Sequence, residues 1–133
     1  MTLKLNVLES YFVEKVNNLS GRNDTKTYIT STLLKYKTAT YDLSKEILIL
    51  EYAKAKEKND FSIYQNLADW ILFVGSIHPN SLKEPSEGYY YSIAQVSYYK
   101  CYTIVNKSWP LFEEMADRLP QITYYLRDEL KKA

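Results

Sequence analysis

Apolar residues recur along this chain at intervals of three and four, the spacing that gathers them on one face of an α-helix. In residues 3–19, for example, Leu8, Phe12 and Val16 form one such row, and the polar residues 20–23 interrupt it. Similar breaks divide the rest of the chain. They predict helices at residues 3–19, 24–37, 41–58, 61–77, 89–105 and 109–119 and after Pro120.

Some of these segments carry apolar residues on more than one side. The run at residues 70–74 makes the end of the fourth segment apolar nearly all round, and residues 89–105 carry a broad tyrosine-rich stripe. Both features are typical of helices buried at the centre of a fold. The third segment has one apolar row through Ile47 and Leu50 and another through Leu48, so we expect it to pack centrally too.

Glycine and proline are scarce, with 3 and 4 residues among 133. A β-rich protein of this size uses more of both in its tight turns. We therefore predict an all-α fold, a single compact bundle of six to seven helices in one domain over residues 1–133, with the fourth and fifth helices central. Threonines at the start of the second segment favour β structure. An α+β domain with a strand over residues 28–34 is the alternative.

Composition excludes several classes of chemistry. One cysteine and one histidine allow no disulfide within the chain, no cysteine-rich metal site and no site with several histidines, and we expect no metal and no cofactor. Lys and Arg total 17 against 16 Asp and Glu, so no basic excess favours nucleic acid or an anionic membrane. The most apolar stretch, residues 70–77, is far shorter than the ~20 residues of a membrane span. We expect a cytoplasmic protein that does not enter a membrane.

Two titratable residues stand out in or just after the fourth segment. Asp69 shares a helix face with Gln65 and precedes the apolar run. It is either a solvent-facing or capping acid, or a buried acid held by a tyrosine hydroxyl from residues 89–105. His78 ends the segment. It either bonds a free backbone carbonyl there or carries a proton beside the loop that follows.

That loop, residues 79–88, is longer than the usual ~4–6 residues that join two helices. It connects a helix end with free carbonyls to a helix start with free N–H groups, where an anion is welcome. We expect a pocket for an anionic or polar small molecule to open beside it. The residues expected to line this pocket are Asp69, His78, Tyr90, Tyr91, Tyr98 and Tyr102.

Residues 67–126 also carry a recognisable order of motifs. These are Leu72-Phe73-Val74-Gly75-Ser76, Pro79, Ser81-Leu82, Tyr90-Tyr91, Ala94, Tyr98, Phe112, Leu119-Pro120 and Leu126. This order resembles an uncharacterised group of small helical bacterial proteins. The resemblance covers under half of the chain, implies one helical domain and lends no activity.

No catalytic constellation emerges from these residues, whereas tyrosine, a residue favoured at interfaces, occurs 14 times. We therefore expect a non-catalytic helical interaction protein, with a protein partner or with itself as a homo-oligomer. Tyr89, Tyr99 and Tyr124 fall off or beside the buried stripes and are the expected interface residues. The alternative is a small-ligand-binding protein or minor enzyme with a tyrosine-lined pocket near residues 79–88. A third hypothesis, a nucleic-acid binder, rests on interleaved lysine and tyrosine at residues 35–37 and 98–100.

Overall fold

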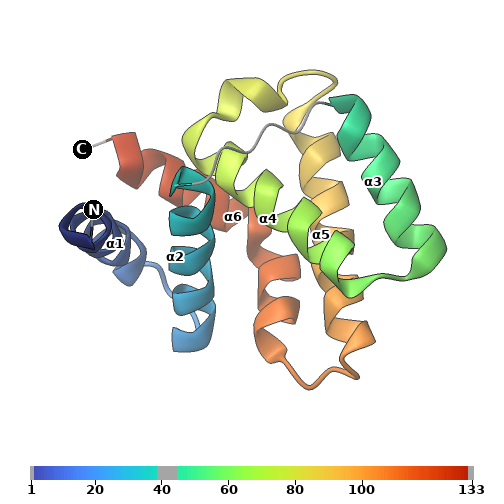
Figure 1. Cartoon of the computed structure of the whole chain (residues 1–133), viewed down its shortest axis with the longest axis horizontal. Helices are drawn as coiled ribbons and strands as arrows, with labels where there is room; N and C mark the ends of the chain where they lie inside the picture. Colours follow the sequence, from blue (N-terminus) through green and yellow to red (C-terminus); the bar gives the residue numbers. More distant parts are fainter. Residues whose placement is uncertain (1, 39–44, 132–133) are drawn as a thin grey trace.

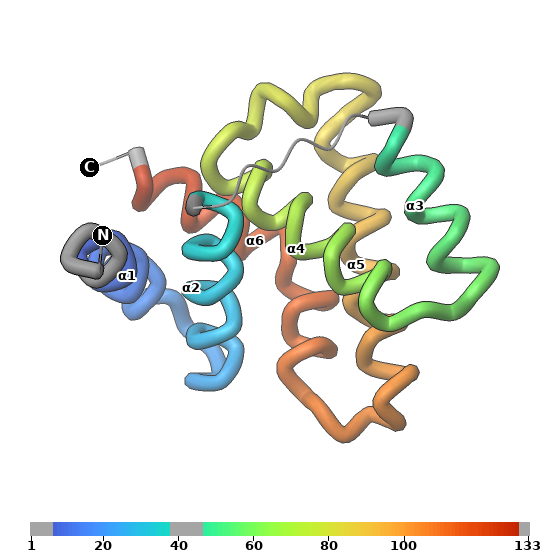
Figure 2. Tube along the Cα trace, in the orientation of Figure 1, coloured from blue at the N-terminus to red at the C-terminus, as the bar shows by residue number. Residues whose placement is uncertain are grey.

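The computed structural model describes residues 2–38 and 45–131. These residues form six α-helices and one short 3-10 helix, and no strand occurs among them (Figures 1 and 2). The all-α prediction is confirmed, and the alternative strand at residues 28–34 is wrong because these residues are helical. The helices are α1 (Thr2–Asn17), α2 (Asn23–Thr38), α3 (Lys45–Lys58), α4 (Phe61–Ile77), η1 (Pro79–Leu82), α5 (Glu87–Ile104) and α6 (Pro110–Lys131).

Helices α4 and α5 form the centre of the bundle, as the sequence predicts. They pack against each other, and α6 packs against both. Figure 1 shows α4 crossing the middle of the molecule, with α1 and α2 on one side and α3 on the other. Helix α1 packs mainly on α2, and the tube of Figure 2 shows α1 and α3 at opposite ends of the view.

Side-chain caps fix where the two central helices begin. The carboxylate of Asp60 accepts a hydrogen bond from the backbone N–H of Ile63 at 3.1 Å, and α4 starts at the next residue. The hydroxyl of Ser86 accepts one from the N–H of Tyr89 at 3.2 Å. Because Ser86 is the cap, α5 begins two residues earlier than the apolar pattern predicts.

The prediction that the third helix packs on two sides is wrong. Leu48 and Ala55 are buried against the rest of the bundle, but Leu50 is 68% exposed and Ile47 is 43% exposed. Helix α3 packs mainly on α4 and lies at the edge of the bundle, so its second apolar row faces outward. The expected start of this helix at residue 41 lies outside the described residues.

Helix α6 is continuous, although Pro120 lies inside it. In Figure 1 the ribbon of α6 changes direction near its middle, as expected for a proline kink. Proline has no N–H, so the carbonyl of Ala116, four residues earlier, loses its helical donor. The side-chain amide of Gln95 on α5 replaces that donor, with Nε2 lying 2.9 Å from the Ala116 oxygen. The proline of one helix is thus matched by a glutamine on its neighbour.

This pairing predicts a thermodynamic coupling between Gln95 and Pro120. Gln95→Met removes the donor and leaves a covered carbonyl unsatisfied, which we expect to lower the free energy of unfolding by about 1–3 kcal/mol. In a Pro120→Ala background the helix supplies its own N–H, and the same substitution should cost much less. Urea unfolding of the four proteins of this double-mutant cycle measures the coupling. Equal costs of Gln95→Met in both backgrounds would contradict it.

Candidate functional site

The carboxylate of Asp69 lies inside the bundle, where the residue is 5% exposed. Its Oδ1 atom accepts two hydrogen bonds, from the hydroxyl of Tyr28 at 2.6 Å and from the hydroxyl of Tyr98 at 2.7 Å. The amide Nε2 of Gln65 donates in turn to the Tyr28 hydroxyl at 3.0 Å. The structure therefore favours the second of our two expectations, a buried acid held by a tyrosine of residues 89–105.

Three helices meet at this carboxylate, because Tyr28 comes from α2, Asp69 from α4 and Tyr98 from α5. Phe112 of α6 closes the group, with its ring centroid 5.5 Å from that of Tyr28 and 6.3 Å from that of Tyr98. The bond between Tyr28 and Asp69 is not among the contacts that we predicted from the sequence. The sequence signal for this bond was the polar face that Gln65 and Asp69 share on α4, because polar side chains that become buried need a hydrogen-bond partner.

Burial raises the pKa of Asp69 to about 6, since a carboxylate loses the stabilisation of water when it is covered. Hydrogen bonds from Tyr28 and Tyr98, and the positive charge of Lys35, act in the opposite direction and favour the ionised form. Burial, together with the nearby Asp69 charge, also raises the pKa of both tyrosines. The arrangement keeps the tyrosines protonated as donors.

Cys101 lies close to this group and is fully covered. Its thiol donates to the backbone carbonyl of Phe61, with an S···O distance of 3.7 Å. Burial, assisted by the charge of Asp69, raises the pKa of the thiol to about 12. A thiolate nucleophile is therefore disfavoured at this position.

The raised pKa of Asp69 predicts a pH-dependent stability. Between the ordinary pKa of 3.8 and about 6, the folded protein holds a proton that the unfolded chain releases. The free energy of unfolding should thus fall as pH rises through this window, by about 3 kcal/mol in total. In Asp69→Asn the amide oxygen still accepts from both tyrosines and does not titrate, so this decrease should be absent. Denaturant unfolding of both proteins from pH 4 to 7 measures it, and parallel pH profiles would contradict the prediction.

Arg127 of α6 occupies the space where the two helix termini beside residues 79–88 approach each other. Its Nε and Nη2 atoms both donate to the backbone oxygen of Gly75, near the end of α4, at 3.2 Å. Nη2 also donates to the Tyr91 hydroxyl at 2.9 Å and lies 3.4 Å from the carboxylate of Glu87. The carbonyl of Gly75 is thus engaged by a side chain of the chain itself, and the same side chain contacts the first turn of α5 through Glu87. This position of Arg127 is not one that the sequence pattern predicts.

The other predicted ligand-binding residues lie in separate surroundings. The hydroxyl of Tyr90 donates to the backbone oxygen of Glu84 at 2.6 Å. His78 is exposed, with its ring 6.1 Å from that of Phe73, and Tyr102 is half-buried beside Tyr99. The structure brings Asp69 to Tyr98, and Tyr91 to Arg127, in different sets of hydrogen bonds. Ligand binding beside residues 79–88 stays a prediction.

The contact between Gly75 and Tyr91 makes a second prediction about stability. A Cβ atom at position 75 would lie 2.9 Å from the Tyr91 hydroxyl and 3.0 Å from Cε1 of its ring. Alanine usually stabilises a helix by ~1 kcal/mol over glycine. Here we expect Gly75→Ala to destabilise by about 1–3 kcal/mol, because Tyr91 is buried and held by Arg127.

Gly88 of α5 is the matched control. A Cβ atom there meets nothing closer than the Ser86 hydroxyl at 4.0 Å. Gly88→Ala should therefore raise the melting temperature while Gly75→Ala lowers it, as differential scanning calorimetry can measure. A shift of the same sign in both variants would refute the proposed close contact.

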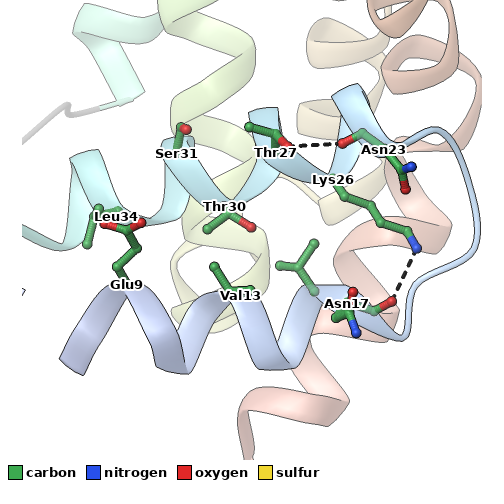
Figure 3. Close-up of a pocket in the computed structure, with 10 residues that line it drawn as sticks. Glu9, Val13, Asn17, Asn23, Lys26, Thr27, Thr30, Ser31 and Leu34 are labelled. Carbon is green, nitrogen blue, oxygen red and sulfur yellow. Dashed lines mark hydrogen bonds between the residues drawn. The ribbon is translucent and has the colours of Figure 1, made fainter. Parts of the chain in front are cut away.

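A groove of about 410 Å³ runs between α1 and α2 (Figure 3). Figure 3 shows Glu9 and Leu34 at one end and Lys26 at the other, with Val13 and Thr30 between them. The ammonium of Lys26 donates to the backbone oxygen of Asn17 at 3.2 Å. The groove is lined by both polar and apolar side chains, and none of them is a site residue predicted from the sequence.

The three predicted interface tyrosines are exposed, Tyr89 by 40%, Tyr99 by 46% and Tyr124 by 50%. Tyr124 contacts its own chain, because the guanidinium of Arg127 lies 5.0 Å from its ring centroid. Tyr89, Tyr99 and Val96, the last 42% exposed, follow one row along α5. We call these three residues the α5 face.

Comparison of the chain with protein-family models, curated proteins and solved structures gave no match. Within residues 2–38 and 45–131, no helix combines the length and the apolar character that crossing a bilayer requires. The same residues contain no group of three or more His, Cys, Asp or Glu side chains arranged to hold a metal ion.

Proposed function

We propose that this chain is a non-catalytic helical interaction protein and that it binds a protein partner through the α5 face. The observation that carries the proposal is the row of Tyr89, Val96 and Tyr99, three large side chains that are each at least 40% exposed on one side of a central helix. Tyrosine supplies a large apolar contact with a polar tip, which suits it to a surface that alternates between water and a partner.

The spacing of the α5 face supports a helical contact. Positions 89, 96 and 99 are separated by seven and three residues, and Ser92 and Thr103 continue the same alternation of three and four. This is the spacing of a seam along which one helix packs on another. Helix α5 already buries its opposite sides against α4 and α6, so the row is a further face that the bundle leaves uncovered.

Buried side chains that could take part in catalysis are hydrogen-bonded within the protein at Asp69, Cys101 and Tyr91, which also supports an interaction role. The carboxylate of Asp69 accepts from two tyrosines, the thiol of Cys101 donates to a carbonyl, and the Tyr91 hydroxyl accepts from Arg127. Each of these contacts contributes to packing between helices. Surface side chains are thus left as the means by which the protein acts on other molecules.

Site-specific photo-cross-linking in the native cells tests this proposal. We expect p-benzoylphenylalanine at position 99 to form a discrete cross-linked species, and Val96→Asp to abolish it. Position 83, an exposed lysine beyond η1, is the control and should give no such species. Circular dichroism checks that the variants remain folded. No species from position 99, or one that survives Val96→Asp, would refute the α5 face as the contact surface.

A further inference from the structure

Beside the α5 face lies a shallow depression of about 480 Å³ between α5 and α6. Its lining residues are Ser92, Gln95, Val96, Tyr99, Lys100, Ala116 and Asp117. Tyr99 is 46% exposed at this depression, so a projecting ring and a hollow lie next to each other on one surface. A surface with both features can fit a second copy of itself.

The charges around the depression are also self-complementary. Lys100 on α5 carries a positive charge and Asp117 on α6 a negative one, and both side chains are exposed. Neither forms a salt bridge within the described part of the chain. One cation and one anion leave the patch without net charge, which selects neither an acidic nor a basic partner.

The floor of the depression can be covered by a partner at little cost in free energy, because its polar backbone acceptor at Ala116 is already hydrogen-bonded. The amide of Gln95 donates to the Ala116 carbonyl at 2.9 Å, so the carbonyl that Pro120 leaves without a helical donor is already satisfied within the chain. Val96 and Ala116 supply apolar surface beside it. Covering this floor therefore leaves the Ala116 carbonyl paired and avoids the cost of burying an unsatisfied acceptor.

We propose that the α5 face and this depression bind a second copy of the chain as a two-fold symmetric dimer, an inference that rests on the proposed function. A two-fold axis that lies in the interface and passes between Lys100 and Asp117 brings each residue against the other residue of the second copy. The dimer then has two equivalent Lys100–Asp117 ion pairs, and Tyr99 of each copy packs over the depression of the other.

Sedimentation equilibrium of the purified full chain tests the dimer, over about 1 to 100 µM, a range that detects dissociation constants in the micromolar region. We expect a dimer. Lys100→Asp alone, or Asp117→Lys alone, places like charges opposite each other and should weaken the dimer at least tenfold. The double variant reverses both charges and should restore it, as a double-mutant cycle requires. Lys83→Asp and Asp128→Lys, at exposed positions outside the depression, are matched controls and should leave the dimer unchanged.

A monomer throughout this range overturns the proposed dimer. So does a dimer that the single variants do not weaken, or one that the double variant does not restore. Cross-linking from position 99 separates this failure from failure of the proposed function. A monomer that still cross-links in cells to a different protein overturns the dimer alone, whereas a monomer without any cross-link overturns both.

Discussion

A carboxylate removed from water must find hydrogen-bond donors inside the protein, and Asp69 imposes this requirement at the centre of the bundle. Its two donors, Tyr28 and Tyr98, come from helices on either side of α4. The bonds therefore determine how α2 and α5 sit along α4, which apolar contacts alone leave less well determined. Phe112 packs against both tyrosine rings and brings α6 into the same arrangement.

Two further buried polar groups follow the same logic. Near the end of α4, the carbonyl of Gly75 accepts from Arg127, and in the kinked α6 the carbonyl of Ala116 accepts from Gln95. In each case one helix presents an oxygen that its own backbone leaves unpaired, and a neighbouring helix supplies the donor. Such bonds are directional, so they select one register of packing among the many that a tyrosine-rich core would tolerate.

The apolar pattern predicts the helices well because periodicity is a local property. The cap at Asp60 and the dense apolar run before His78 define α4 to the residue. Partners across the bundle are harder to predict, since Tyr28 lies 41 residues from Asp69 and Arg127 lies 52 residues from Gly75. Periodicity tells which side of a helix is buried but not which helix covers it. The prediction that α3 packs on two sides was wrong for the same reason, because no helix covers its second apolar row.

The internal hydrogen bonds also bear on where a partner can bind. Helix α5 is bonded to α4 through Tyr98 and to α6 through Gln95, and its first turn is capped by Ser86. The α5 face therefore belongs to a helix whose position is fixed by hydrogen bonds. A partner that docks on a rigid surface loses less conformational entropy than one that must first order its target. The outer row of α3 lies at the edge of the bundle and lacks such bracing by helices on both sides. The core hydrogen bonds that define the fold thus also favour the α5 face over the exposed isoleucine and leucine side chains of α3 as the place where another chain binds.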